Sequence, residues 1–295
     1  MKISSLAQEM EAYVRSLQDR ICASLEKVDG RSVFRESMWD RPGGGGGRSR
    51  ILEGGGVFEK AGVNVSAVFG ELPALMAERL GSKEKDFFAT GISLVLHPFS
   101  PQVPTVHANF RYFEQPGRSW FGGGADLTPY VWSPDEFKHF HRTLKKPCDL
   151  FLDSAYSQFK KACDDYFFIP HRGERRGVGG IFFDYLEKDK EQTFDFVKRS
   201  GDCFIESYIP IVERQMSKSF SEREKKFQLL RRGRYVEFNL VYDRGTLFGL
   251  QTKGNIESIL MSLPAVVNFD YQADMEKTED EKQLMDVFRN PKDWA

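Results

Sequence analysis

Cysteine is scarce in this sequence. Its 295 residues include four cysteines, Cys22, Cys148, Cys163 and Cys203, and no two of them form a C-x-x-C pair. Zinc fingers and thioredoxin-type redox sites need closely spaced cysteines, and small secreted domains need a denser disulfide framework. The cysteine content argues against these classes and favours a reducing compartment.

An excess of charge of one sign is also missing. Lysine and arginine number 42 against 43 acidic residues, which gives a formal net charge of -1. Proteins that bind nucleic acid usually carry a basic excess. The longest stretch without charge, residues 87–110, contains three prolines and two histidines, which is unlike a membrane-spanning helix. The N-terminal segment lacks the apolar block of a signal peptide. We expect a cytoplasmic protein with no nucleic-acid partner and no transmembrane segment.

Several common cofactor motifs are absent. The sequence has no G-x-G-x-x-G and no H-E-x-x-H. The glycines at 249 and 254 have the spacing of a phosphate-binding loop, but Asn255 and Ile256 follow where Lys and Ser or Thr are required. Gly91 begins a stretch that lacks the second glycine of a nucleophile elbow. Flavin, nicotinamide and nucleotide chemistry are therefore unsupported.

Aromatic residues are abundant. The chain has 26 Phe, 10 Tyr and 4 Trp, or 14% of its residues. Rings in this number suit a large, flat, apolar ligand, although most of them are expected to serve the core.

Two neighbouring stretches alternate with the period of a β-strand. In residues 91–97 and 105–112 the apolar residues recur at every second position. The positions between them include Ser93, His97, Thr105, His107, Asn109 and Arg111. Side chains two residues apart on a strand share a face. Because solvated strand faces usually carry Thr, Lys and Glu, we expect this polar row to line a pocket.

The remaining patterns predict an α+β protein. Helices are expected over residues 6–21, 133–144, 152–166, 257–263 and 278–290, and further strands over 180–184, 235–242 and 247–252. Capping boxes mark the helix starts at Ser133 and Thr278. Mostly hairpin-linked strands with flanking helices indicate a flat antiparallel sheet between helical layers. We predict a single domain over residues 1–295, with a flexible glycine-rich loop at about 41–56.

Histidines and arginines are the remaining candidates for chemistry. His97, His107, His141 and His171 are the candidate ligands of a divalent metal, although hydrogen-bonded structural histidines explain them equally well. Arginines cluster in residues 172–176 and 231–234, besides Arg111. Guanidinium groups bind carboxylates in a bidentate fashion. The alternative is that these arginines form ion pairs with the many acidic residues.

Long motifs in a fixed order resemble one enzyme family. They include Pro104-Thr105-x-His107-x-Asn109-x-Arg111, Trp120-Phe121-Gly122-Gly123-Gly124-x-Asp126, Arg176-Gly177-x-Gly179-Gly180-Ile181-Phe182-Phe183-Asp184, Gly233-Arg234-Tyr235-Val236-Glu237-Phe238-Asn239 and Tyr242-Asp243-Arg244-Gly245-Thr246. Together they are similar to the oxygen-dependent coproporphyrinogen III oxidases, and the resemblance covers nearly the whole chain.

The resemblance implies a reaction and an assembly. Coproporphyrinogen III is oxidatively decarboxylated to protoporphyrinogen IX in haem biosynthesis, with molecular oxygen as oxidant and release of carbon dioxide and hydrogen peroxide. No organic cofactor is implied, and a homodimer is implied through the carboxy-terminal region. Two other classes stay open at this point: a metal-dependent oxygenase or hydrolase built on the histidines, and a noncatalytic tetrapyrrole-binding protein.

The resemblance also implies roles for individual residues. The substrate-binding positions are Ser93, Asn109, Arg111, Asp126, Arg176 and Gly254, and the catalytic positions are His107, Asp126 and Arg111. His107 matches a proton donor, and Asp126 matches a carboxylate that holds the pyrrole N–H groups.

The metal question and one departure from the family pattern remain open. The four histidines named above match metal ligands of bacterial relatives, but their spacings form no recognised cage and favour catalysis without a metal. By the resemblance, relatives usually carry arginine at the position of Asn255, so either Lys253 supplies the charge there or this contact with the substrate is weaker.

Overall fold

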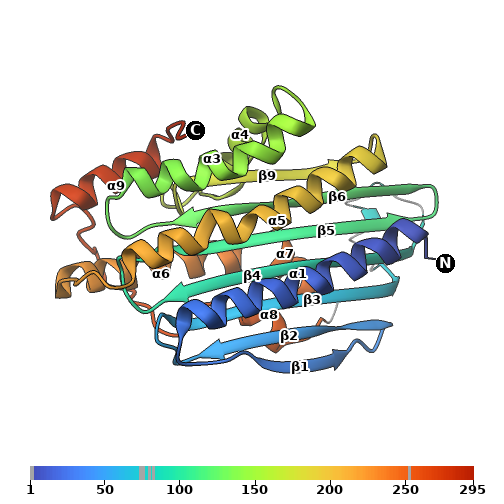
Figure 1. The fold of residues 1–295 in the computed structure, drawn as a ribbon, viewed down its shortest axis with the longest axis horizontal. Coiled ribbons are helices and arrows are strands. Elements are labelled where there is room, and N and C mark those ends of the chain that lie inside the picture. Colours follow the sequence, from blue (N-terminus) through green and yellow to red (C-terminus); the bar gives the residue numbers. More distant parts are fainter. Residues whose placement is uncertain (1–2, 73–76, 79–80, 82–83, 252–253) are drawn as a thin grey trace.

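One antiparallel sheet is the centre of the computed structural model of this chain (Figure 1). The structure describes residues 3–72, 77–78, 81, 84–251 and 254–295. Seven strands follow the order β1-β2-β3-β4-β5-β6-β9. They are β1 Arg35–Asp40, β2 Gly45–Glu53, β3 Phe58–Glu71, β4 Asp86–Pro98, β5 Thr105–Gln115, β6 Arg118–Thr128 and β9 Gly179–Leu186. A small hairpin, β7 Phe168–Ile169 and β8 Glu174–Arg175, lies apart from the sheet.

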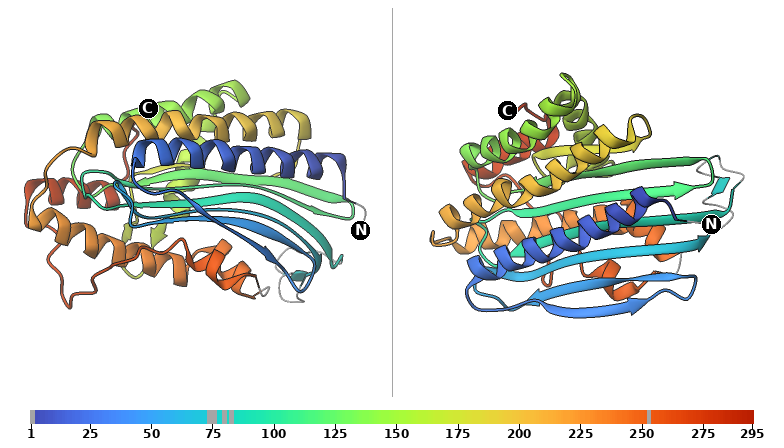
Figure 2. Two further views of the ribbon diagram at one scale, coloured as in Figure 1. Left: turned by 60° about the horizontal axis from the view of Figure 1, so that its bottom comes forward. Right: turned by 45° about the vertical axis from the view of Figure 1, so that its right-hand side comes forward.

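Helices cover both faces of the sheet (Figure 2). One face carries α1 Ser5–Asp29, α3 Pro134–Phe151 and α5 Lys190–Gln215, and α4 Ala155–Tyr166 packs against β9. The opposite face carries α6 Glu222–Val241, α7 Arg244–Gln251 and α8 Ile256–Leu260. The last helix is α9 Glu279–Arg289. The predicted α+β architecture, an antiparallel sheet between helical layers, is confirmed. No helix in the described part of the chain is long and apolar enough to cross a membrane.

The alternation predicted for β4 and β5 separates a core face from a polar face. Ile92, Leu94, Val106 and Phe110 are buried in the main hydrophobic core beneath α1 and α5. The intervening polar residues point to the other face, toward α6, α7 and α8. The period of two thus decides which side of the sheet is the core and which side is free for a ligand.

The predicted glycine-rich loop is wrong, because most of it is strand. Gly45, Gly46 and Gly47 begin β2, between β1 and β3. A Cβ atom at Gly46 would lie 2.2 Å from the Trp39 carbonyl oxygen, and one at Gly47 would lie 2.3 Å from the Trp39 ring. The glycines therefore permit close packing around Trp39.

The strand predicted over residues 235–242 is also wrong, as is the one over residues 247–252. The first belongs to α6, a helix that begins with a complete capping box between Ser221 and Glu224. The second belongs to α7 up to Gln251, and Thr252 lies outside the described residues. Among the described residues after Leu186, none adds a strand to the antiparallel sheet.

The predicted helix starts have different caps. Thr278 and Glu281 form the expected capping box of α9. Ser133 precedes α3 as predicted, but its side chain makes no cap hydrogen bond. Glu136, its expected partner, instead binds Arg214 of α5, with Arg214 Nε 3.0 Å from Glu136 Oε1. A contact between two helices has replaced a local cap.

Candidate functional site

A cavity of about 580 Å³ lies on the polar face of the sheet. Its walls come from β3, β4, β5, β6 and β9 on one side and from α6, α7 and α8 on the other, and Tyr166 of α4 also lines it. Figure 2 shows α6, α7 and α8 on the side of the sheet opposite α1. The cavity lies between the sheet and its second helical layer.

Part of the predicted polar row lines this cavity, whereas His97 and Thr105 are buried outside its lining. His107, Asn109 and Arg111 line it from β5, and Ser93 of β4 lies opposite Asn109 in the strand register. The Nη1 atom of Arg111 donates to Oδ1 of Asn109 at 2.7 Å. Two adjacent strands thus present an imidazole, an amide, a guanidinium and a hydroxyl to one ligand.

A buried ion pair between Asp126 and Arg176 contacts His107. Asp126 of β6 pairs with His107 in the register of the sheet and is only 1% exposed. Arg176 donates from Nε to Oδ2 at 2.9 Å and from Nη2 to Oδ1 at 2.8 Å. His107 Nδ1 lies 2.8 Å from the same Oδ1. Both carboxylate oxygens are occupied, and the carboxylate reaches the cavity through His107 and Arg176, which line it.

The charges of this group fix the histidine tautomer. Burial raises the pKa of Asp126, but the Arg176 guanidinium and the hydrogen bond with His107 outweigh burial and hold the pKa below its usual value. Burial also disfavours charge on Arg176, yet Asp126 raises its pKa. An ionised Asp126 can only accept, so His107 Nδ1 carries the proton that it donates to Asp126. Nε2 is then the nitrogen left to exchange a proton with a ligand.

Aromatic rings hold the Arg176 guanidinium in place. Its central carbon lies 3.9 Å from the ring centroid of Phe167, 4.5 Å from that of Tyr235 and 5.0 Å from that of Phe238. Nη1 donates to Asn239 Oδ1 at 2.8 Å. These contacts fix a buried cation by stacking and hydrogen bonds together.

Further rings form flat parts of the cavity wall. Tyr166 stacks on Phe182 with centroids 4.2 Å apart, and Phe113 stacks on Trp120 at 4.3 Å. All four line the cavity. The expectation that part of the aromatic content serves a ligand site agrees with this arrangement, while most other rings lie in the core.

Some charged residues of the cavity, Asp184 and Arg244 among them, were not assigned from the sequence. Asp184 of β9 lies 2.9 Å from Arg111 and 3.8 Å from Arg244 of α7, measured between Oδ2 and the Nη2 atoms. Both residues line the cavity. The strand period would have indicated Asp184, because it shares a face with Phe182 two residues before it.

Gly254 lies in a smaller cavity of about 230 Å³, which shares Ser93, Asn109 and Arg111 with the larger one. Lys253 lies outside the described residues. Asn255 is the N-cap of α8, where its Oδ1 accepts from the backbone N–H of Ser258 at 2.9 Å. Asn255 therefore caps a helix in this chain.

The structure does not bring the four candidate metal ligands together. His97 is buried between Thr105 and the Ser262 carbonyl oxygen, 3.2 and 2.9 Å from its ring nitrogens. His141 is buried in α3 between Tyr156 and the Val178 carbonyl oxygen, at 2.8 and 3.2 Å. Burial, with a nearby cation in each case, lowers the pKa of both to about 3, so both imidazoles are neutral.

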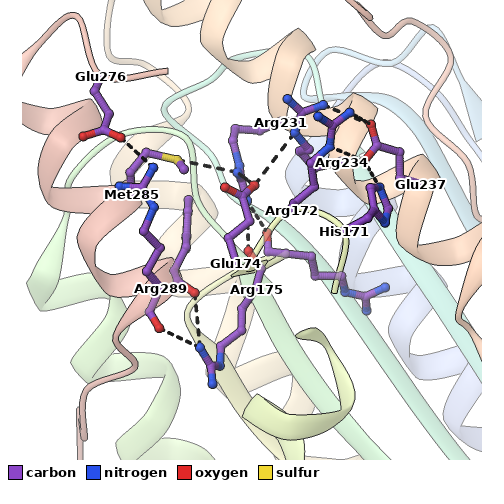
Figure 3. A network of polar contacts seen from close by, with 12 residues as sticks. His171, Arg172, Glu174, Arg175, Arg231, Arg234, Glu237, Glu276, Met285 and Arg289 are labelled. Carbon is purple, nitrogen blue, oxygen red and sulfur yellow. Dashed lines mark hydrogen bonds and ion pairs between the residues drawn. The ribbon is translucent and has the colours of Figure 1, made fainter. Parts of the chain in front are cut away.

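The other two candidate histidines lie in separate places, His107 in the cavity and His171 in a surface network (Figure 3). His171 binds the Tyr242 hydroxyl at 2.6 Å and Glu237 Oε2 at 2.8 Å. Within residues 3–72, 77–78, 81, 84–251 and 254–295, no three His, Cys, Asp or Glu side chains are placed to hold one metal ion. The four histidines do not fit a single metal centre.

The arginine clusters mostly form ion pairs within the protein. Arg172 binds Glu237 at 2.7 Å, and Arg231 binds Glu174 (Figure 3). Of residues 172–176 and 231–234, only Arg176 lines the large cavity. Internal ion pairing, the alternative considered for these clusters, therefore describes Arg172 and Arg231.

Comparisons with known proteins agree with this geometry. The family model described as Coproporphyrinogen III oxidase matches residues 9–294. A relative from Glycine max, named oxygen-dependent coproporphyrinogen-III oxidase, chloroplastic, is 48% identical over 99% of this chain and 80% of its own length. A relative from Prochlorococcus marinus, named oxygen-dependent coproporphyrinogen-III oxidase, is 46% identical over 97% of this chain and 92% of its own length. The chain therefore belongs to the coproporphyrinogen III oxidase family.

Proposed function

We propose that this protein catalyses the oxygen-dependent conversion of coproporphyrinogen III to protoporphyrinogen IX, a step of haem biosynthesis. The observation that carries the proposal is the identity of 46–48% over nearly the whole chain with proteins named for this activity. The cavity supports the proposal, because stacked aromatic rings and arginines line the same cavity on the polar face of the sheet. A macrocycle that bears four carboxylates needs both.

The proposed reaction converts two propionates to vinyl groups. At each propionate, the bond to the carboxyl carbon and one C–H bond of the neighbouring carbon break, and a C=C bond forms. Carbon dioxide leaves, and molecular oxygen takes up two electrons and two protons to become hydrogen peroxide. Oxygen is therefore the co-substrate, and the protein must hold the propionate and manage protons.

The residues of the polar row can perform both tasks, binding the propionate and exchanging protons. We assign Arg111, with Ser93 and Asn109 beside it, to binding a substrate carboxylate. His107 exchanges protons through Nε2, because Asp126 holds the proton on Nδ1. A positioned acid or base of this kind contributes roughly 10²–10⁴-fold to a rate.

The direct contact between Asp126 and pyrrole N–H groups stays a prediction. In this structure, the carboxylate is bound to Arg176 and His107. We therefore assign to Asp126 a role that acts through these two residues: it holds the imidazole in one tautomer and keeps Arg176 at the cavity wall. Arg176 contacts the ligand from that position.

An assay of the purified protein tests the proposed function. Coproporphyrinogen III is added under air, and oxygen uptake is recorded together with the fluorescence of the porphyrin products after oxidation. The proposal predicts carbon dioxide and a divinyl product. Tight binding without oxygen uptake would instead indicate a noncatalytic tetrapyrrole-binding protein.

Replacing Arg111 with alanine is expected to raise the Michaelis constant about tenfold or more, because a charge-assisted pair with a carboxylate is lost. The turnover number should change less, since His107 and its partners remain in place. Steady-state kinetics with Arg111→Lys as the matched variant separate charge from the bidentate fork, and the lysine should recover part of the affinity. A Michaelis constant equal to that of the wild type would contradict the role of Arg111.

Removing metal ions is expected to leave activity unchanged, because the candidate histidines are hydrogen-bonded in separate places. The measurement is elemental analysis of the active protein, followed by the assay before and after dialysis against a chelator. A stoichiometric metal whose removal abolishes turnover would contradict this expectation and favour the metal-dependent alternative.

A homodimer through the carboxy-terminal region is part of the proposal. Large apolar side chains between α8 and α9 are exposed, namely Val266, Phe269 and Tyr271. Such side chains are typical of surfaces that a partner covers. Light scattering after size-exclusion chromatography gives the mass of the assembly in solution and so tests the dimer.

A cytoplasmic location also stays a prediction, and cell fractionation tests it.

A further inference from the structure

A β-bulge interrupts the edge of the sheet at the cavity. Gly123 of β6 pairs with Phe183 of β9, whereas Phe121 pairs with Leu186, so Asp184 and Tyr185 lie opposite Gly122 alone. Tyr185 has a φ of 53°, in the left-handed region that non-glycine residues rarely adopt. Bulges with such strain occur next to functional sites, where they redirect a side chain. Tyr185 is the residue that departs from the strand alternation here, and it lines the cavity together with Asp184.

At the bulge, the Asp184 carboxylate lies between two guanidinium groups. Oδ2 lies 2.9 Å from Arg111 and 3.8 Å from Arg244, and Oδ1 accepts the backbone N–H of Tyr185 at 3.0 Å. A Cβ atom at Gly122 would lie 2.6 Å from Asp184 Oδ1 and 2.8 Å from Arg111 Nη2. Gly122 thus leaves the space that the ion pair occupies.

Both arginines have other contacts that hold them without Asp184. Arg111 donates to Asn109 at 2.7 Å and lies 6.0 Å from the Phe182 ring centroid. Arg244 lies 4.7 Å from the centroid of Tyr166. Asp184 is therefore not needed to orient the two cations. Its carboxylate lines the cavity instead, at the place where a ligand carboxylate would meet them.

We propose that Asp184 is an internal substitute for a ligand carboxylate: it neutralises Arg111 and Arg244 in the empty cavity and competes with a substrate carboxylate for them. This inference rests on the proposed function, which makes the ligand a tetracarboxylate. The competition lowers affinity for the substrate and the product alike, and so it favours release. Asp184 is thus a residue that sets specificity and affinity through the two arginines.

Asp184→Asn tests the inference, because it removes the negative charge and keeps the shape. The probe is coproporphyrin III, the aromatic and stable form of the proposed substrate, titrated by fluorescence. We expect its dissociation constant to fall about three- to tenfold, as for the loss of one competing surface charge. The Michaelis constant should fall with it, and the affinity should depend more steeply on salt.

Glu187→Gln is the matched control. Glu187 lies just beyond β9 and binds Arg118 at 2.6 Å, away from the cavity lining. The Glu187→Gln variant removes the same charge from the same edge of the sheet. Its dissociation constant for coproporphyrin III should equal that of the wild type. An equal fall in both variants would overturn the inference, because any lost charge would then suffice.

An unchanged or larger dissociation constant for Asp184→Asn would also overturn it. If this variant does not fold, Asp184→Ser takes its place. If neither folds, Asp184 serves the sheet rather than the ligand, and the inference is wrong. Failure of the proposed function is seen separately, as wild-type protein that binds the porphyrin but consumes no oxygen with coproporphyrinogen.

Discussion

Asp126→Asn is expected to lower turnover at least about a hundredfold and to destabilise the fold by about 3–5 kcal/mol. The buried Arg176 guanidinium loses its counter-ion in this variant. The amide also presents either an oxygen or an NH₂ group to His107, so it no longer enforces the proton on Nδ1. One substitution thus removes an ion pair and the control of a tautomer.

The two effects are separated by adding a second substitution. Arg176→Gln alone leaves a buried carboxylate without its cation and should destabilise the fold as well. The double variant Asp126→Asn with Arg176→Gln contains no unpaired charge, so urea unfolding should show a smaller loss than the two single losses together. Turnover should stay low in the two single variants and in the double variant. Near-normal turnover of Asp126→Asn would contradict the role of this carboxylate, whatever its stability.

The polar row could be predicted from the sequence because its cause is local. Residues two apart on a strand share a face, and the apolar partners of the row show which face is the core. His107, Asn109 and Arg111 therefore line one cavity, as the alternation implied. The adjacent strand adds Ser93 through the strand register, which the short connection between β4 and β5 makes expected.

The partner of Asp126 could not be predicted in the same way. Arg176 follows it by 50 residues and comes from the loop before β9. Nothing local distinguishes Arg176 from Arg172, which binds Glu237 instead. The bulge at Asp184 and Tyr185 arises in the pairing of β6 with β9, so it is also a tertiary property.

Residues 235–242 show how a local pattern can mislead. Their aromatic and β-branched residues alternate with polar ones and suggest a strand. The buried residues of α6 include Phe227, Leu230, Arg231, Tyr235 and Phe238, which recur every three or four positions. The longer window is decisive, because the helical period extends over 20 residues whereas the alternation covers eight.

The second large effect concerns the turn between β2 and β3. Asp29, at the end of α1, is only 6% exposed. Its carboxylate accepts backbone N–H groups from Arg31, Ser32, Gly56, Val57 and Phe58. A Cβ atom at Gly55 would lie 2.2 Å from Asp29 Oδ2. The second group of glycines, like the first, permits close packing.

Asp29→Asn is expected to lower the free energy of unfolding by about 2–4 kcal/mol, because buried N–H groups lose a charged acceptor. Burial raises the pKa of Asp29, but the backbone hydrogen bonds outweigh it and lower the pKa below its usual value. A pKa that is lower in the folded state means that the unfolded chain binds more protons as the pH falls. The stabilisation is therefore complete above about pH 5 and is lost as the pH falls through the usual range near 4 and below it.

Urea unfolding at pH 7 and at pH 3 tests both parts of this expectation. The wild type should lose more stability than Asp29→Asn between the two values, because the variant lacks the group that titrates. Asp135→Asn is the control, since that side chain is 94% exposed and pairs only with Lys138 at 3.5 Å among the described residues. Its unfolding should match the wild type within about 0.5 kcal/mol at both pH values. An equal acid dependence in Asp29→Asn and the wild type would show that the carboxylate does not hold the turn, and the glycines would then need another explanation.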